Sequence, residues 1–95
     1  MVSYVYILAS RKHGTLYIGH TRNLARRLFE HREELADGFT RRYGVKRLVH
    51  YEVHDDITNA RQRERNLKKW PRAWKIQLIE KDNPGWEGLA DQLAP

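Results

Sequence analysis

The hydrophobic positions of the chain form three short runs with the alternation of β-strands. Residues 2–9 alternate and are rich in Val, Ile and Tyr. A second run at residues 15–18 follows a turn at residues 12–14, so the two runs predict a hairpin that ends at Gly19. Residues 46–54 predict a third strand around an apolar centre.

The first helix is expected between the second and third strands. Asn23 is a good N-cap, and the helical spacing of leucines after it predicts a helix that runs to about Ala36. Asp37-Gly38 is expected to close this helix, and residues 39–44 are expected to form a polar loop.

Two further helices are expected after the third strand. Asp55 or Asp56 can cap a helix over residues 57–69. Pro71 suits the first turn of another helix over about residues 72–81, which the Asn83-Pro84-Gly85 sequence interrupts.

The predicted order of elements is β-β-α-β-α-α, which indicates an α+β fold with a three-stranded, mostly antiparallel sheet flanked by helices. The length of 95 residues favours one domain. We therefore expect residues 1–95 to form a single domain, with a core over about residues 3–82 and a short C-terminal tail.

Two polar residues fall on the apolar side of the first helix. Leu24, Leu28 and Leu35 line one stripe, His31 lies inside that stripe and Arg27 lies on its edge. Arg27 and His31 are also four residues apart, so their side chains can converge. The structural alternative is that Arg27 extends to solvent and His31 is a hydrogen-bonded core residue.

The second helix has a carboxylate in the same kind of position. Glu64 lies in the middle of the apolar face that Ile57, Ala60 and Leu67 define. A carboxylate there is either a metal ligand or the partner of a buried salt bridge, and Arg27 is the obvious partner for such a bridge.

Tyrosines mark one face of the expected hairpin. Tyr4 and Tyr6 share a face by alternation, and Tyr17 can lie across from one of them. Aromatic packing on a sheet explains such residues by itself. A functional role is favoured only if the inward Arg27, His31 and Glu64 share that sheet face.

Taken in order, these residues resemble the GIY-YIG nuclease family, over roughly residues 3–80. The first signature triplet appears as Tyr4-Val5-Tyr6 and the second as Tyr17-Ile18-Gly19. Arg27 and His31 have the family's R-x-x-x-H spacing, and Glu64 follows the third strand, where the family places its metal-binding glutamate.

The resemblance is closest to the small members that consist of the catalytic module alone. Those members often carry a Phe-Thr pair and a tyrosine in the loop, here Phe39, Thr40 and Tyr43. Tyr4 replaces the glycine of the first triplet. For the family's late asparagine, Asn83 is preferred over Asn66.

The resemblance implies a magnesium-dependent endonuclease. Glu64 is expected to hold Mg²⁺, with Mn²⁺ as an alternative, and Arg27 to grip the phosphate. Tyr6 is expected to be the general base, Tyr17 to orient the water or phosphate, and His31 to accept or relay a proton. The remaining expectations are a catalytic Asn83 and a Gly19 that allows a tight backbone turn beside the site.

The charge of the chain supports a polyanionic partner. The net charge is +6, and seven of the 18 basic residues lie between Arg61 and Lys75. Although many small proteins are basic, this clustering favours contact with nucleic acid, and DNA is favoured over RNA. The expected contact residues are Arg22, Arg26, Thr40, Arg41, Arg42, Tyr43, Arg61, Arg65, Lys68 and Lys69.

The composition excludes several other classes. The chain has no cysteine, so disulfides and Cys-based zinc sites are excluded, and its histidines lack compact zinc-ligand spacing. The apolar run at residues 2–9 is too short for a signal peptide or a membrane span, so a cytoplasmic protein is expected. No obligate protein partner is inferred.

Three functional readings therefore stay open from the sequence. The first is an endonuclease in repair, recombination or processing. The second is a nucleic-acid-binding domain that keeps the fold without catalysis. The third is a structural or partner-binding domain in which Arg27 and Glu64 form a buried salt bridge.

Overall fold

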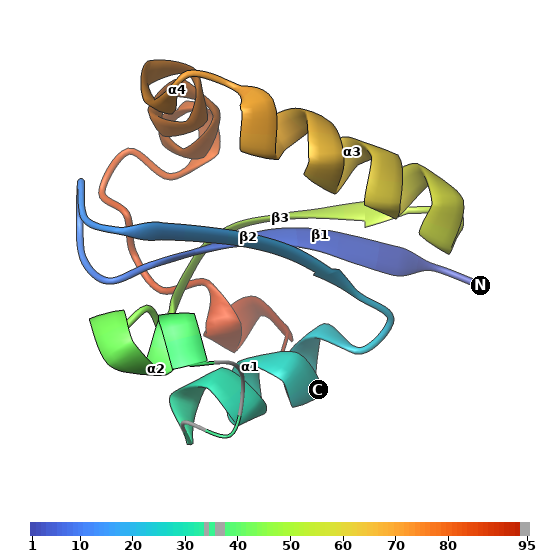
Figure 1. Cartoon of the computed structure of the whole chain (residues 1–95), viewed down its shortest axis with the longest axis horizontal. Coiled ribbons are helices and arrows are strands. Elements are labelled where there is room, and N and C mark those ends of the chain that lie inside the picture. The colour runs from blue at the N-terminus through green and yellow to red at the C-terminus, as the bar shows by residue number, and fades with distance from the viewer. Residues whose placement is uncertain (34, 36–37, 94–95) are drawn as a thin grey trace.

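The computed structural model describes residues 1–33, 35 and 38–93, and its centre is a three-stranded antiparallel sheet in the order β2-β1-β3 (Figure 1). The elements are β1 (Ser3–Ala9), β2 (Leu16–Thr21), α1 (Leu24–Arg32), α2 (Gly38–Tyr43), β3 (Arg47–His54), α3 (Ile57–Lys69), α4 (Arg72–Asp82) and the 3₁₀ turn η1 (Ala90–Leu93). The α+β class and the antiparallel three-stranded sheet are confirmed, and α2 is an addition to the expected order.

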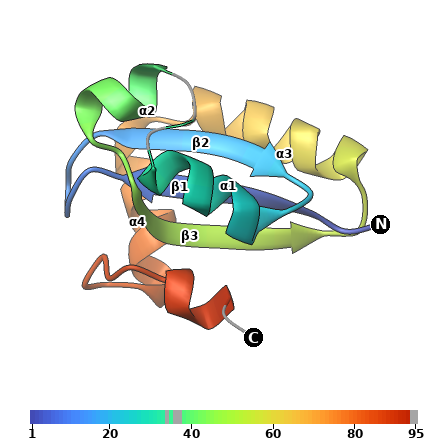
Figure 2. The same cartoon turned by 90° about the horizontal axis from the view of Figure 1, so that it is seen from below.

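The helices cover both faces of the sheet, as Figures 1 and 2 show. Helices α3 and α4 lie on one face, where Val5 and Ile7 of β1 pack against Ala60, Leu67 and Ile79 in one buried cluster. Helices α1 and α2 lie on the other face, where a second cluster contains residues from β1, α1 and β3: Tyr6, Leu8, Leu24, Leu28, Val45 and Leu48. The alternation of β1 thus supplies both cores, because successive side chains of a strand point to opposite faces.

Strand β2 is longer than expected. Its pairing with β1 continues through Gly19, which lies opposite Tyr6, to Thr21, which lies opposite Tyr4. The prediction that Gly19 ends the strand is therefore wrong, since the backbone ladder does not depend on a side chain at that position. Extension of the strand brings His20 onto the sheet face covered by α3.

Helix α1 is shorter than expected and ends at Arg32, with Glu33 as its C-cap. Leu35 is 69% exposed, so it does not continue the apolar stripe of Leu24 and Leu28. The rest of the expected end, Ala36 and Asp37, lies outside the described residues.

Helix α2 replaces part of the expected polar loop. Gly38, Phe39, Thr40 and Tyr43 have low helical propensity, and Thr40 is the buried residue of this helix. Tertiary packing of this turn, which leads directly into the buried Val45, overrides the local preference for a loop.

The chain continues to pack after residue 82. Trp86 is completely buried in the cluster beneath α3 and α4, while Leu89 and Leu93 pack against the cluster on the opposite face. The Leu89 backbone N–H donates to the Leu48 carbonyl at 2.9 Å, so the segment passes around the β3 edge of the sheet. Within the described part of the chain, no helix combines the length and apolar character needed to cross a membrane.

Candidate active site

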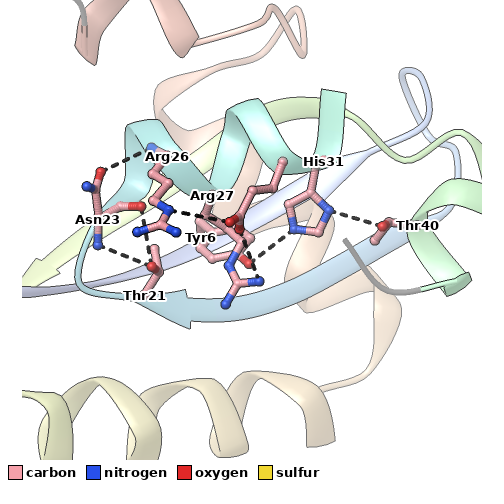
Figure 3. Close-up of polar contacts among 8 residues, drawn as sticks. Tyr6, Thr21, Asn23, Arg26, Arg27, His31 and Thr40 are labelled. Atoms are coloured by element: carbon pink, nitrogen blue, oxygen red, sulfur yellow. Dashed lines mark hydrogen bonds and ion pairs between the residues drawn. The ribbon is translucent and has the colours of Figure 1, made fainter. Parts of the chain in front are cut away.

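Tyr6, Tyr17 and His31 form one cluster between the hairpin and α1, and Figure 3 shows the Tyr6–His31 contact within it. Oη of Tyr6 and Nε2 of His31 are hydrogen-bonded at 3.4 Å. The Tyr17 ring lies 5.4 Å from the His31 ring and 6.3 Å from the Tyr6 ring, between centroids. Tyr17 is opposite Leu8 rather than a tyrosine, so it reaches Tyr6 as a diagonal neighbour.

Thr40 holds the other side of the His31 ring. Its Oγ1 lies 3.0 Å from Nδ1 of His31, and only 2% of Thr40 is exposed. The expectation that Thr40 contacts nucleic acid is wrong, because this side chain is covered and faces the histidine. Its place in the structure is to orient the imidazole, which needs partners at both nitrogens when it is buried.

Gly19 is needed for close approach rather than for a turn. A Cβ at this position would lie 2.7 Å from Oη and 2.8 Å from Cζ of Tyr6, and 3.1 Å from Cε1 of Tyr17. The buried Tyr6 ring therefore lies directly over the backbone of Gly19. Because Gly19 has no side chain, the Tyr6 hydroxyl can occupy the position from which it contacts His31.

Gly19→Ala is expected to destabilise the protein by about 1–3 kcal/mol, because the added methyl overpacks a buried ring. The same change is expected to move the Tyr6 hydroxyl away from His31. Thermal unfolding and the NMR shifts of the His31 ring measure the two effects. Gly38→Ala is the matched control, since a Cβ there meets no atom within 4 Å; a control that loses as much stability would contradict the steric explanation.

Arg27 lies at the edge of this cluster and is half-exposed. Its Nη1 is 3.5 Å from Oε1 of Glu30, while Nε of Arg26 is 3.5 Å from Oε2 of the same carboxylate. In Figure 3 the Arg27 side chain reaches from α1 toward β2. A surface hollow at this place is lined by Thr21, Arg22, Asn23, Arg26, Arg27 and Glu30.

Glu64 lies on the other face of the sheet, where α3 covers β2. Its Oε1 is 2.5 Å from Nδ1 of His20, its Oε2 is 2.6 Å from Nζ of Lys68, and 16% of its side chain is exposed. Burial raises the pKa of Glu64, but hydrogen bonds from Lys68 and His20 outweigh burial and leave the pKa below its ordinary value. The carboxylate is therefore ionised at neutral pH, in a second hollow lined by His20, Arg61, Glu64, Arg65 and Lys68.

The two hollows adjoin the same stretch of edge strand β2, at the consecutive residues His20 and Thr21. Arg27 approaches this stretch from the α1 face, and Glu64 approaches it from the α3 face. The alternative expectation of an Arg27–Glu64 salt bridge is wrong, because the sheet separates them and each pairs with other residues. The condition set for a functional role of the tyrosines is met only in part. His31 and Arg27 lie on the α1 side with Tyr6, whereas Glu64 lies on the α3 side.

Asn83 has a different environment from the tyrosine cluster. Its side-chain N–H₂ donates to the carbonyls of Val49 and Glu87 at 3.1 and 2.9 Å, and its Oδ1 accepts from the Glu87 backbone at 3.0 Å. Val49 belongs to β3, at the opposite edge of the sheet from β2. These contacts give Asn83 a structural role that joins the end of α4 to β3. Asn66, the other candidate, is exposed and bonds Gln62 at 3.0 Å.

The expected nucleic-acid contacts fall into two groups. The first group adjoins β2 and contains Arg22, Arg26, Arg61, Arg65 and Lys68. The second group is the exposed part of α2, where Arg42 lies over the Tyr43 ring at 5.6 Å and Arg41 precedes them. Lys69 is exposed beside Lys68 on α3. Apart from Thr40, each of these residues is exposed or lines a hollow.

Two polar residues of the site were missed from the sequence. The sequence pattern assigns His20 no role because the second strand is expected to end at Gly19, but its alternation with Ile18 places it on the α3 face once β2 is extended. Glu30 was overlooked, although its spacing of three and four residues from Arg27 and Arg26 is the pairing distance on a helix.

The donor set at Glu64 fits a weakly held, hydrated divalent ion. Among the described residues, no three His, Asp or Glu side chains converge in a way that could hold a metal. Mg²⁺ is commonly bound through one or two carboxylates while it keeps several waters, so a single partly exposed carboxylate in an open hollow suits it. His20 is close enough to orient that carboxylate.

The tyrosine triplets, Arg27, His31 and Glu64 all lie within one match to a known protein family. The sequence model of the GIY-YIG catalytic domain matches residues 2–77. The chain belongs to the GIY-YIG family. The match spans both tyrosine triplets, α1 and Glu64, and it ends before Asn83.

Relatives of this GIY-YIG protein are small proteins of similar length. It is 41% identical over 83 residues to a UPF0213 protein of Syntrophus aciditrophicus, which covers 86% of this chain and 93% of the relative. It is 38% identical over 78 residues to one of Clostridium perfringens, which covers 82% of this chain and 83% of the relative. The solution NMR structure of a UPF0213 protein from Bacillus halodurans matches with a TM-score of 0.57 and 32% identity, over 93% of both chains.

Proposed function

We propose that this protein is a metal-dependent endonuclease that hydrolyses phosphodiester bonds in nucleic acid. The observation that carries the proposal is the placement of Arg27 and Glu64 on either side of His20 and Thr21, with Arg27 on the same side of the sheet as the Tyr6–His31 pair (Figure 3). Such a hydrolase must neutralise the phosphate, activate a water and help the leaving oxygen, and these residues supply matching groups.

The phosphate is gripped by Arg27 in this proposal. Its guanidinium stays charged at any physiological pH and presents a planar set of donors that matches two nonbridging phosphate oxygens. In the free protein Glu30 holds this group at 3.5 Å, a long contact that a phosphate can displace.

In this proposal the proton of the attacking water is removed by the hydrogen-bonded pair of Tyr6 and His31. The proposal takes the tautomer of His31 in which Nδ1 donates to Oγ1 of Thr40, 3.0 Å away, so that Nε2 accepts from the Tyr6 hydroxyl, 3.4 Å away. Tyr6 is 1% exposed whereas Tyr17 is half-buried, so an incoming substrate meets Tyr17 first. Tyr17 then orients the water or phosphate. Tyr6, as general base, takes a proton from the attacking water and gives its own hydroxyl proton to Nε2 of His31.

Glu64 is the carboxylate that would hold Mg²⁺ or Mn²⁺. When bound, such an ion supplies positive charge to the phosphate and assists departure of the 3′ oxygen. The contribution of the chain is to keep the carboxylate ionised through its contacts with Lys68 and His20.

The substrate we propose is DNA, in repair, recombination or processing, in the cytoplasmic setting expected from the sequence. The basic groups around β2 are suited to contacts with the phosphate backbone, which position a nucleic acid without reading its bases. Recognition of this kind responds to shape and deformability, so distorted or branched DNA is the preferred form.

One observation favours a non-catalytic nucleic-acid-binding domain as the second candidate. Both oxygens of Glu64 are already paired, with His20 and Lys68, as they would be in a purely structural network. Under this alternative the protein binds DNA or RNA but cuts neither.

A substrate screen separates the two candidates. Labelled duplex, flap and single-stranded DNA and single-stranded RNA are incubated with purified protein in Mg²⁺, in Mn²⁺ and in EDTA. We expect cleavage of at least one DNA form in the metal-containing reactions and none in EDTA. Binding without cleavage on every substrate, or cleavage that survives EDTA, would overturn the metal-dependent nuclease.

A further inference from the structure

The two oxygens of Glu64 are held by different kinds of partner. Oε1 faces Nδ1 of His20, a short side chain fixed on strand β2, at 2.5 Å. Oε2 faces the ammonium of Lys68, one helical turn later on α3, at 2.6 Å. The Lys68 side chain is 54% exposed, whereas the His20 side chain is 29% exposed.

Because of this difference we expect the His20 contact to persist and the Lys68 contact to be replaced more easily. An imidazole on a paired strand loses little freedom when it bonds, and such neighbours commonly orient metal-binding carboxylates. An exposed lysine at i+4 has a long flexible stem and forms a weak pair that solvent screens. A divalent ion carries twice the charge of the ammonium and is therefore the stronger competitor for Oε2.

We propose that Lys68 is an internal stand-in for the metal. Its ammonium neutralises Oε2 of Glu64 until a hydrated divalent cation displaces it. The inference rests on the proposed metal site and adds the state of that site before metal arrives. His20 keeps Oε1 throughout, so the carboxylate has the same orientation in both states.

Once displaced, the Lys68 ammonium can contact nucleic acid. Lys68 lines the same hollow as Arg61 and Arg65, so after release its charge adds to the groups that face the nucleic-acid backbone. Lys68 therefore opposes metal binding in the free protein and favours binding of the polyanion once the metal is present.

Mn²⁺ binding to the protein alone tests this exchange. Isothermal titration calorimetry without nucleic acid compares wild type with Lys68→Gln and with Lys69→Gln, which removes the same charge from the next, exposed position of α3. We expect Lys68→Gln to bind Mn²⁺ about three- to ten-fold more tightly, because a competitor is gone. Lys69→Gln is expected to stay within about two-fold of wild type, because its charge is screened by solvent.

If Lys68→Gln binds Mn²⁺ no more tightly than Lys69→Gln does, the stand-in role of Lys68 is wrong. Glu64→Gln separates this failure from that of the proposed function. If Glu64→Gln loses Mn²⁺ binding while Lys68→Gln is unchanged, the metal site stands and the exchange is wrong. If both Lys68→Gln and wild type bind Mn²⁺ as expected but no substrate is cut, the exchange stands and the nuclease proposal is wrong.

Discussion

Arg27→Ala is expected to slow single-turnover cleavage by about 10²- to 10³-fold, the usual loss when one preorganised donor to a transition-state charge is removed. The fold is expected to be unchanged, because Arg27 is half-exposed and its long contact to Glu30, at 3.5 Å, is on the helix surface. Rapid-quench kinetics at saturating protein measures the chemical step, and circular dichroism checks the fold.

Arg26→Ala is the matched control for this prediction. Arg26 neighbours Arg27 on α1, pairs with the same Glu30 carboxylate at 3.5 Å and carries the same charge. We expect Arg26→Ala to weaken binding of the nucleic acid. The slope of the logarithm of the binding constant against the logarithm of salt concentration should fall in magnitude by about one, which is the loss of one phosphate contact. The single-turnover rate should stay within a few-fold of wild type. If the two variants lose cleavage rate equally, Arg27 is a general backbone contact and its catalytic assignment is wrong.

Glu52→Gln is expected to lower the free energy of unfolding at pH 7 by about 2–3 kcal/mol, because it removes the anion from a partly buried network. Glu52 lies on β3 and accepts two hydrogen bonds from Arg63, both at 2.9 Å, together with contacts from His50 and His54 at 2.9 and 3.2 Å. Only 19% of its side chain is exposed. Chemical denaturation measures the loss, and Glu33→Gln, on a side chain that is 50% exposed, is the control and should cost less than about 0.5 kcal/mol.

The same network predicts how the loss depends on pH. Burial raises the pKa of Glu52, but hydrogen bonds from His50, Arg63 and His54 outweigh burial and hold the pKa far below its usual range. A carboxyl with a lowered folded pKa stabilises the protein fully above its unfolded pKa, about 4.3, and loses that contribution as pH falls toward the folded value. The difference between wild type and Glu52→Gln should therefore shrink below about pH 4; a difference that grows there would contradict the lowered pKa.

The parts of the site that follow from local periodicity were predictable. Alternation places Tyr4 and Tyr6 on one face of β1, and the four-residue spacing on α1 brings Arg27 and His31 to the same side. These patterns need only a strand and a helix of the right type, and the residues concerned lie within β1 and within the part of the predicted helix that forms as α1.

The parts that depend on tertiary arrangement were not predictable. An inward position on α3 identifies Glu64, but periodicity does not say which face of the sheet a helix covers, so the Arg27–Glu64 bridge could not be excluded. The polar composition of residues 39–44 predicts a loop, and only tertiary packing turns Thr40 toward His31. His20 does not follow from local pattern either, because Gly19 predicts the end of a strand that in fact continues to Thr21.

The measurement that tests the central claim most directly is cleavage of the best substrate by wild type and by Glu64→Gln, across a titration of Mg²⁺. The substitution keeps the shape of the side chain and removes the charge that would hold the ion, while Lys68 and His20 stay in place. We predict metal-dependent cleavage by wild type and a rate at least about 10²-fold lower for Glu64→Gln at every Mg²⁺ concentration. Equal rates for the two proteins would contradict a nuclease whose metal is held by Glu64.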